Sequence, residues 1–380
     1  MFILSIILSL CQILTKIRRR NSATPQLIYS SASMTLPGRA AISSGTEGQI
    51  FMKYDFITIG GVTEDITFYT DEGVLVNNRK DLLKQKLLAF EYGAKIKVDR
   101  SFSSFGGGAA NAAVCFSRLG FKSACLGVVG RDPRGQIILN NFKNQGVDII
   151  LMQKTKKAET GFSFLLVGLE NEHICFSNRA ANNELRITNY ELRILPNAKW
   201  IYLTSLSGKW RENLAKIFSV KKVKIAWNPG HRQILTGAEV LKKYFKGVDC
   251  LTVNKDEAIE IVMSDKKLKN KAAGFFKQTK NLLSALAAYG PKIVVITDGR
   301  FGADARVQNQ DYHQPIIKEK KRVDTTGVGD AFGSSLIAGL ELYNYDIKLA
   351  LRLAAKNAAA EISAQGSQNG LLRKKDIMKA

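Results

Sequence analysis

The sequence contains few residues of the kinds that build metal clusters and disulfide frameworks. Its 380 residues include three histidines and five cysteines, and no two cysteines form a Cys-x-x-Cys pair. A zinc cluster and a disulfide framework are therefore not indicated, and a reducing compartment such as the cytoplasm fits best. Only seven residues are proline while 45% are hydrophobic, so the chain is neither collagen-like nor wholly disordered.

Acidic residues are also scarce. The chain has 33 Asp and Glu against 56 Lys and Arg, which gives a formal net charge of +23. Positive charge favours encounter with anionic ligands, but it does not determine a fold. No RNP, zinc-finger or basic-aromatic pattern accompanies the charge, so we expect no specific nucleic-acid binding.

The amino-terminal segment has no hydrophobic run long enough to cross a bilayer. Its apolar stretch, Met1 to Leu14, falls short of the ~20 residues that a spanning helix needs. Its basic residues follow the apolar run, whereas in a secretory signal they precede it. Membrane contact by residues 1–20 is therefore not expected.

A single domain is predicted to begin near Met52. Residues 21–49 are rich in Ser, Ala, Gly and Thr, which is typical of a flexible linker. We predict that residues 1–51 form an amino-terminal tail outside the domain and that Met52 is the physiological start. Residues 52–380 would then form the domain and would still carry a charge of +19.

Strand and helix patterns alternate along this domain. Short apolar runs predict buried strands at 56–59, 124–129, 200–203, 224–227, 250–253 and 293–297. Helical patterns cover 109–119, 134–145, 209–218, 255–262, 282–289, 330–342 and 347–363. This alternation favours an α/β domain whose parallel sheet is covered by helices on both faces.

Two segments depart from the alternation and read as pairs of half-buried strands. Residues 65–70 with 94–98, and 161–167 with 173–177, alternate apolar and polar side chains. We expect these lid strands, from about 65–70, 94–98 and 161–177, to form a small sheet that projects from the main one.

The stretch Asp324 to Asp330, DTTGVGD, carries the strongest chemical signal. At a helix start, the backbone N–H groups of Gly327, Val328 and Gly329 can converge on an anion, and the helix dipole favours negative charge there. Asp330 in the first helical turn could accept a proton from an attacking hydroxyl. The alternative is a glycine-rich turn with an acidic cap.

DTTGVGD and several further segments, which occur along the chain in the same order as in the family, resemble the ribokinase-like (PfkB-type) carbohydrate kinase family. DTTGVGD is similar to the family's carboxy-terminal signature, with Val328 in place of a usual Ala. GGAAN at 107–111 with RLG at 118–120 resembles the amino-terminal signature. Weaker matches follow in family order at 127–135, 182–185, 228–230, 254–257 and 297–303, so the resemblance runs from about Met52 to Gly370.

The resemblance implies a substrate site. Asp65 corresponds to the carboxylate that accepts hydrogen bonds from substrate hydroxyls, although alone it would be an ordinary loop residue. Gly107 and Gly108 correspond to a hinge that moves on sugar binding, or they form only a tight turn before the helix. Asn111 can donate to and accept from sugar hydroxyls.

The resemblance also implies nucleotide and metal contacts. Asn254 and Glu257, three apart at a helix start, would hold the phosphates and position Mg²⁺ through water, or they form only a capping box. The residues implied for the nucleotide are Thr297, Gly299 and Gly302 at the phosphates and ribose, and Asn357 and Gly366 near the adenine. The residues implied for a monovalent cation, potassium in many members, are Asp324 and Thr326.

We therefore expect a ribokinase-like three-layer α/β/α sandwich with a small β-sheet lid. The implied reaction transfers the γ-phosphoryl group of ATP to an alcohol of a sugar or related small molecule, with Asp330 as base. No P-loop motif or protein-kinase signature is present, and Ala109 stands where ribose-specific members often have Lys. A nucleoside kinase of the same fold and a non-catalytic sugar or nucleotide sensor are the alternatives, and a homodimer through the lid is conceivable.

Overall fold

The computed structural model describes residues 54–77, 86–168 and 173–377. All of them belong to one compact unit, Ile50–Ala380. The predictions of a tail at residues 1–51, a start at Met52 and no membrane contact by residues 1–20 lie outside the described residues. Within those described ranges, no helix has the length and apolarity needed to span a membrane.

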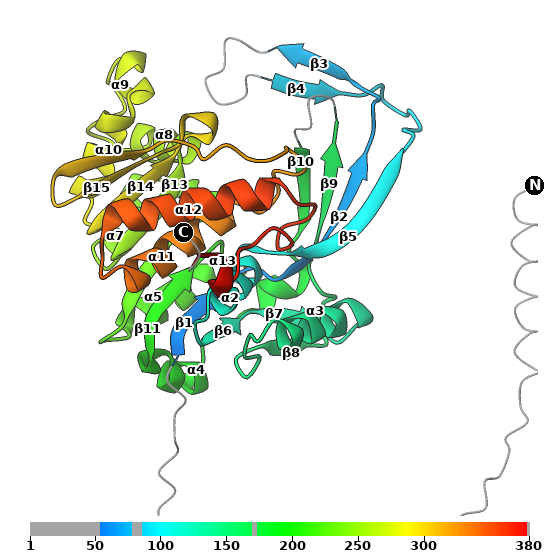
Figure 1. The fold of residues 1–380 in the computed structure, drawn as a ribbon, viewed down its shortest axis with the longest axis horizontal. Coiled ribbons are helices and arrows are strands. Elements are labelled where there is room, and N and C mark those ends of the chain that lie inside the picture. The colour runs from blue at the N-terminus through cyan, green and yellow to red at the C-terminus, as the bar shows by residue number, and fades with distance from the viewer. Residues whose placement is uncertain (1–53, 78–85, 169–172, 378–380) are drawn as a thin grey trace, which may run out of the picture. The chain divides into compact units, whose positions relative to one another are not determined.

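An eight-stranded sheet forms the centre of the unit (Figure 1). Its strands, in spatial order, are β16 (Gln310–Gln314), β15 (Ala303–Val307), β14 (Ile293–Thr297), β13 (Cys250–Asn254), β12 (Lys224–Trp227), β11 (Ala198–Leu203), β1 (Tyr54–Ile59) and β6 (Ser123–Leu126). The strands from β6 to β14 are parallel, and β15 and β16 add an antiparallel hairpin at one edge. The carboxyl ends of the parallel strands therefore meet at one edge of the sheet, where α/β proteins bind ligands.

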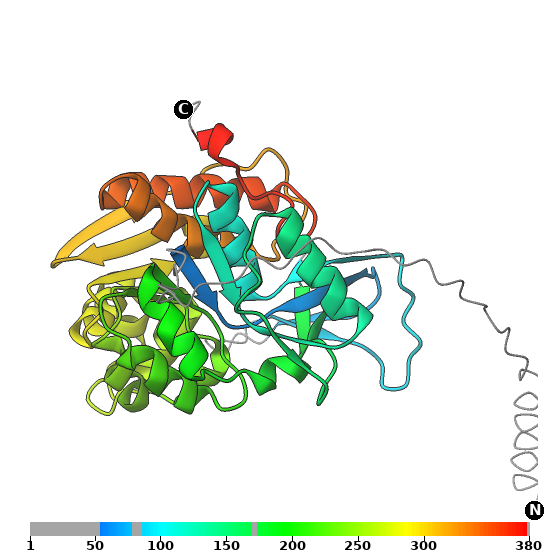
Figure 2. The same ribbon diagram turned by 90° about the horizontal axis from the view of Figure 1, so that it is seen from below.

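Helices cover both faces of this sheet. The first face carries α5 (Trp210–Ser219), α7 (Ala238–Phe245), α8 (Lys255–Met263) and α10 (Thr279–Ala288), and the second carries α2 (Gly108–Arg118), α3 (Pro133–Asn144), α11 (Val328–Leu342) and α12 (Ile347–Ile362). Figure 2 shows α11 and α12, in orange, opposite the green and yellow helices of the first group. Shorter helices are α4 (Asn189–Ile194), α6 (His231–Ile234), α9 (Ala273–Lys277) and α13 (Lys374–Ile377).

Two hydrophobic cores result, one on each face of the sheet. Side chains alternate along a strand, so Ile57 and Ile59 of β1 pack into the first core while Phe56 packs into the second. Phe56 stacks on Phe116 of α2 with ring centroids 3.9 Å apart. The predicted three-layer α/β/α sandwich is confirmed.

A separate four-stranded sheet forms the lid. Its order is β10 (His173–Asn178), β9 (Phe162–Val167), β2 (Thr63–Tyr69) and β5 (Arg100–Gly106), and a hairpin of β3 (Val74–Asn77) and β4 (Lys86–Ala89) accompanies it. The prediction of a strand at 94–98 was wrong. The seven residues of β2 pair from Thr63 with Gly106 to Tyr69 with Arg100, so residues 94–98 lie beyond the end of the strand that they would need as a partner.

The strand predicted at 124–129 is broken into two. Gly127 separates β6 from β7 (Val128–Gly130), which pairs with β8 (Gln153–Thr155) in another small sheet. The chain passes Val62 closely here, because a Cβ at Gly127 would lie 2.5 Å from a methyl carbon of Val62. An apolar run alone does not reveal such a close approach.

Candidate active site

Asp330 lies in the first turn of α11 at the carboxyl edge of the main sheet. The N-cap Gly327 adopts a left-handed conformation, φ 78°, which most side chains avoid. A Cβ built on Gly329 would meet no atom within 4 Å, so the start of the helix faces open space. Backbone N–H groups at an open helix start can bind an anion.

The glycine pair before α2 brings a second helix start to Asp330. Gly107 has φ 92°, and a Cβ there would lie 2.4 Å from the carbonyl oxygen of Gly61. A Cβ on Gly108 would lie 3.1 Å from Oδ1 of Asp330. One turn later, Asn111 donates from Nδ2 to Oδ2 of Asp330 over 2.8 Å. The structure therefore brings Asp330, Gly108 and Asn111 together.

The Asp330 carboxyl has an acidity suited to proton transfer near neutral pH. Burial raises its pKa to about 6. The hydrogen bond from Asn111 opposes this rise because it favours the ionised form, and the nearby negative charge of Asp65 adds to it.

Asp65 lies within lid strand β2 and is only 5% exposed. Thr63 donates from Oγ1 to Oδ1 of Asp65 over 3.0 Å, and Ser367 makes a longer contact of 3.5 Å with Oδ2. Burial raises the pKa of Asp65. A Cβ at Gly106 would overlap this carboxylate, so the position needs glycine, a requirement that the sequence did not reveal.

A cavity of about 670 Å³ adjoins the open start of α11. It includes Thr297, Gly299 and Gly302, which the sequence assigned to the nucleotide, together with Val328 and Gly329. Its apolar walls consist of Pro315, Ile316, Ile317, Phe332, Ala355, Ala358, Ala359 and Ile362. Its charged side chains are Arg300, Glu319 and Arg322.

Asn254 and Glu257 form a reciprocal capping box at the start of α8. Asn254 accepts from the Glu257 amide over 2.8 Å, and Glu257 accepts from the Asn254 amide over 2.9 Å. Asn254 pairs with Thr297 on the neighbouring strand, which puts this helix start beside the cavity. Burial raises the pKa of Glu257 to about 7, and Asp330 is among the charges that add to the rise. The capping box considered as the alternative for this pair is thus present, and neither residue is among those that line the cavity.

Asp324 and Thr326 lie together before α11. Asp324 is 7% exposed and accepts from the backbone amides of Thr326, over 2.9 Å, and Gly366, over 3.0 Å. Oγ1 of Thr326 is buried and has no hydrogen-bond partner among the described residues. An orphaned buried hydroxyl beside a carboxylate fits a cation ligand set.

Asn357 and Gly366 do not line the cavity, contrary to the sequence-based expectation. Asn357 is fully buried, donates to Oγ of Ser335 over 2.5 Å and accepts from the Leu372 amide over 2.8 Å. It lies on the face of α12 turned away from the cavity-lining alanines. Gly366 packs against Ser104 of the lid, 2.9 Å from an added Cβ.

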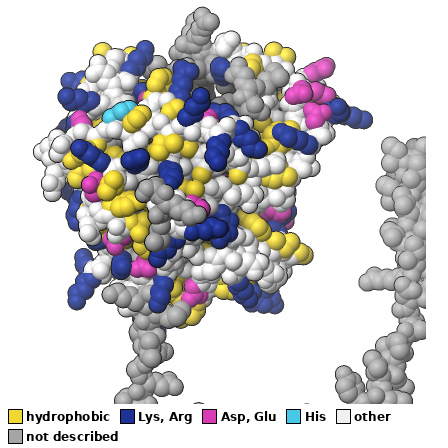
Figure 3. All heavy atoms as spheres, in the orientation of Figure 1, with side chains coloured by type: hydrophobic (Ala, Val, Ile, Leu, Met, Phe, Trp, Pro, Cys, Tyr) yellow, Lys and Arg dark blue, Asp and Glu magenta, His cyan; other side chains and the backbone are white. Residues whose placement is uncertain are grey.

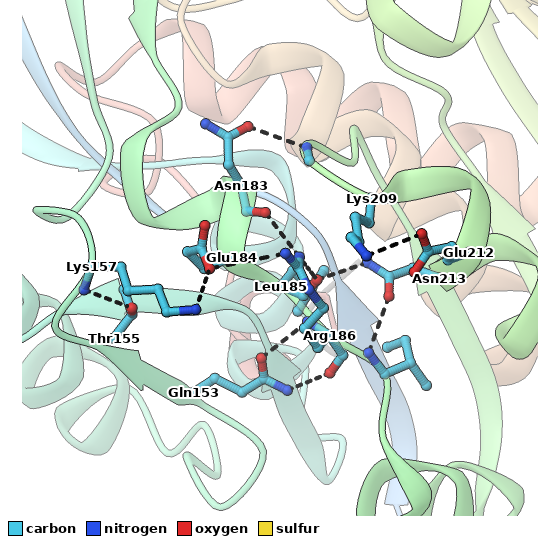
Figure 4. A network of polar contacts seen from close by, with 12 residues as sticks. Gln153, Thr155, Lys157, Asn183, Glu184, Leu185, Arg186, Lys209, Glu212 and Asn213 are labelled. Atoms are coloured by element: carbon cyan, nitrogen blue, oxygen red, sulfur yellow. Dashed lines mark hydrogen bonds and ion pairs between the residues drawn. The ribbon is translucent and has the colours of Figure 1, made fainter.

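The NNEL motif at residues 182–185 has a structural role, because its polar groups bond to neighbouring segments. Asn182 binds both the amide and the carbonyl of Val62, over 3.0 and 2.9 Å. Figure 4 shows the adjoining network, in which Asn213 donates to the Leu185 carbonyl over 3.0 Å and Gln153 donates to the Arg186 carbonyl over 2.6 Å. The motif therefore connects α5 and β8 to the lid and contributes no side chain to the cavity.

The fold and this arrangement define the class of ribokinase-like small-molecule kinases. The family model described as pfkB family carbohydrate kinase matches residues 80–374, and the chain belongs to that family. The chain is 27% identical over 285 residues to the ribokinase of Haemophilus influenzae, across 72% of this chain and 86% of that protein.

Solved structures show the same fold. The Arabidopsis thaliana ribokinase complexed with ribose and ATP matches with a TM-score of 0.69 at 20% identity, covering 86% of this chain and 98% of that one. The Burkholderia thailandensis nucleoside kinase in complex with inosine matches with a TM-score of 0.67 at 18% identity, covering 85% and 96%.

The predicted family, fold class and kinase activity are confirmed. The protein is an enzyme that transfers a phosphoryl group to an alcohol of a sugar or related small molecule, and kinases of this family use ATP. The alternative of a non-catalytic sensor is therefore set aside.

Proposed function

We propose that Asp330 is the base that accepts the proton of the attacking alcohol. The observation that carries this proposal is the joint position of Asp330, Asn111 and Gly108 at the open start of α11, beside the cavity. A carboxyl with a pKa of about 6 is mostly ionised at pH 7 and is still basic enough to take up a proton in the transition state. The backbone N–H groups of Gly327, Val328 and Gly329 would bind the negative charge that develops on the transferred phosphoryl group.

The acceptor would lie between α2 and the lid. Asp65 and Asn111 approach Asp330 from β2 and α2, and both carry oxygen atoms that can accept from hydroxyls. The glycines at 107 and 108 would let the two layers close over the acceptor, which excludes water as a competing nucleophile.

The cavity beside Gly329 is suited to a nucleotide. Its volume of about 670 Å³ lies in the range of small-molecule sites. The walls formed by Ile316, Ile317 and Ala359 can pack against a purine base, while Arg300 and Arg322 bring positive charge to the phosphates. Thr297, Gly299 and Gly302 also line this cavity.

The residues present fit two metal ions. Glu257, whose pKa responds to the charge of Asp330, would hold Mg²⁺ through a single carboxylate and retained water, and the ion would neutralise phosphate charge. Asp324 and the orphaned hydroxyl of Thr326 offer oxygen ligands to a monovalent cation such as K⁺.

Sugars and nucleosides are the two acceptor classes to compare. Ala109 is fully buried in the position where many ribose-specific members have Lys, which disfavours ribose. The test is an ADP-release assay with hexoses, pentoses, adenosine, inosine and cytidine, each with and without Mg²⁺ and K⁺. Turnover with one sugar well above all nucleosides supports a carbohydrate kinase, the reverse indicates a nucleoside kinase, and no turnover with any acceptor contradicts the proposal.

We propose the domain organisation that the sequence indicates, together with a dimer. Residues 52–380 would form the kinase domain, with residues 1–51 outside it. Ile174 and Phe176 are 38% and 53% exposed on edge strand β10, which supports a homodimer through the lid that light scattering can detect.

The free cysteines and the distribution of surface charge bear on the cellular setting of the protein. Three of the four cysteines among the described residues are buried and all four are free, which supports a reducing, cytoplasmic setting. Figure 3 shows Lys and Arg side chains interspersed with other types over one face, so the positive charge does not support a nucleic-acid groove there.

A further inference from the structure

The turn that follows α12 reaches three acidic groups of the candidate site with three consecutive residues. The amide of Gly366 donates to Asp324 over 3.0 Å, and the hydroxyl of Ser367 lies 3.5 Å from a carboxylate oxygen of Asp65. The third residue, Gln368, reaches Asp330 indirectly. No sequence motif assigns Ser367 or Gln368 to the site.

Gln368 belongs to a chain of three side-chain amides that ends at Asp330. Asn141 of α3 donates from Nδ2 to Oε1 of Gln368 over 3.0 Å, and Gln368 donates from Nε2 to Oδ1 of Asn111 over 3.0 Å. Asn111 then donates from Nδ2 to Oδ2 of Asp330 over 2.8 Å. Gln368 and Asn111 each accept on the carbonyl oxygen and donate from the NH₂ group, so all three donors point toward the carboxylate.

The orientation of Asn111 matters because its two ends have opposite polarity. With Nδ2 toward Asp330, the amide stabilises a carboxylate. Rotated by 180°, it would bring a carbonyl oxygen against that carboxylate, which is repulsive. Gln368 is 4% exposed and Asn111 is 3% exposed, so water cannot readily replace a lost partner. The donor from Gln368 and the acceptor on Asp330 therefore favour the same orientation of Asn111.

The backbone of Gln368 is itself anchored. Arg118 at the end of α2 donates from Nη1 to the carbonyl oxygens of Gln368 and Leu371. The same helix therefore supplies both Asn111 and the guanidinium that holds the turn. A change in the Gln368 side chain leaves this backbone anchor in place.

We propose that Gln368 is a positioning residue, which fixes the Asn111 amide with its NH₂ group toward Asp330 and thereby sets the pH below which the enzyme loses activity. This inference rests on the proposed role of Asp330 as base. Gln368 would act only through Asn111, since no direct contact between Gln368 and Asp330 is among the described hydrogen bonds.

The electrostatics of the site give the direction of the effect. Burial raises the pKa of Asp330 to about 6, and the Asn111 hydrogen bond is the interaction that lowers it. The other titratable groups that face Asp330 are Asp65 on β2, Tyr202 on β11, Glu257 on α8 and Glu361 on α12. Of these, Asp65 is the group whose negative charge favours protonation of Asp330. None of the four is a cation, so a lost donor is not compensated by these groups. Disordering Asn111 must then raise the pKa of Asp330.

The test replaces Gln368 with a side chain of similar length that cannot hydrogen-bond. In Gln368→Met, we expect the acid limb of the kcat/KM profile to move to higher pH by about half a unit to one unit, since one unit corresponds to about 1.4 kcal/mol. Turnover at pH 8, where Asp330 is ionised in either case, should stay within a few-fold of wild type. The Asp330 carboxyl carbon, titrated by ¹³C NMR and assigned with Asp330→Asn, should shift its midpoint in the same direction.

The matched control is Gln233→Met. Gln233 is also a fully buried amide, but its hydrogen bonds go to the backbone of Leu206 and Gly230, away from Asp330. We expect it to lower stability without moving the acid limb. Asn141→Leu, which removes the far end of the chain, should give a smaller shift of the same sign and serves if Gln368→Met does not fold.

The outcomes separate this inference from the proposed function. An unchanged NMR midpoint in Gln368→Met, or equal shifts in both Gln→Met variants, would overturn the positioning role. Near-normal turnover of Asp330→Asn would instead overturn the role of Asp330 as base, while the NMR titration would still report whether Gln368 controls its carboxyl.

Discussion

Glu361, in the last turn of α12, is an acid whose burial should be visible in the stability of the protein. It is fully buried, and neither carboxyl oxygen accepts a well-formed hydrogen bond from the described residues. The Gly370 amide lies close enough to favour the ionised form of the carboxyl group. Burial raises its pKa to about 8, with Arg118 opposing the rise and Asp324 and Asp330 adding to it. Glu361 is therefore mostly protonated in the folded protein at pH 7.

The sign of the pH dependence follows from proton release. The unfolded chain loses the Glu361 proton near pH 4.5, and the folded protein holds it until about pH 8. Between these values the unfolded state gains stability with rising pH, so this residue lowers the free energy of unfolding by up to about 1.4 kcal/mol per pH unit. Well above pH 8, where Glu361 is ionised in both states, the free energy of unfolding no longer changes with the titration of this residue.

The replacement Glu361→Gln keeps the shape and removes the titration. A buried amide without partners costs about 1–3 kcal/mol at every pH. We therefore compare the free energy of unfolding of the variant with that of wild type, and ask how the difference between them changes from pH 5 to pH 8.5. We expect this difference to move in favour of Gln by about 4 kcal/mol across that interval.

Urea unfolding followed by tryptophan fluorescence measures it, since Trp200, Trp210 and Trp227 are all buried. The exposed Glu212 of α5 provides the control: Glu212→Gln should leave its stability curve parallel to that of wild type within about 0.5 kcal/mol. Parallel curves for Glu361→Gln and wild type would refute the reasoning, because they would mean that Glu361 is ionised in the folded state or solvated.

Two further substitutions test the geometry around the base. Gly108→Ala puts a Cβ 3.1 Å from Oδ1 of Asp330, so we expect kcat to fall about 10-fold or more with little loss of stability. The control is Gly274→Ala, whose Cβ meets nothing within 4 Å and which should leave kcat unchanged. Equal kcat values in the two variants would contradict the close approach of Gly108 to Asp330. Glu257→Gln retains an acceptor for the Asn254 amide, so the melting temperature should stay unchanged. The Mg²⁺ concentration that gives the half-maximal rate should rise about 10-fold. An unchanged Mg²⁺ dependence would show that Glu257 does not belong to the metal site.

Local features of the site were predictable from the sequence, since they depend on neighbouring residues. The glycines before Asp330 signal a helix start with open N–H groups, and α11 begins at Val328, two residues before the predicted start at Asp330. The capping box of Asn254 and Glu257 was predictable for the same reason, because the spacing of three residues between cap and acid is itself the signal.

Features that depend on distant pairing were not predictable. The lid strand expected at 94–98 lies instead at β5, since its position is fixed by the length of β2 rather than by its own alternation. Asn357 was misplaced because the small residues around it allow either face of α12 to meet the cavity. The contact between Gln368 and Asn111 joins residues 257 positions apart, and no local pattern encodes it.

The most direct test of Asp330 as base compares turnover and nucleotide binding in Asp330→Asn. With an acceptor found in the ADP-release assay, we predict that kcat falls by about three orders of magnitude or more while calorimetry shows ATP bound within a few-fold of wild-type affinity. A variant that binds ATP and turns over at a near-normal rate would contradict the account.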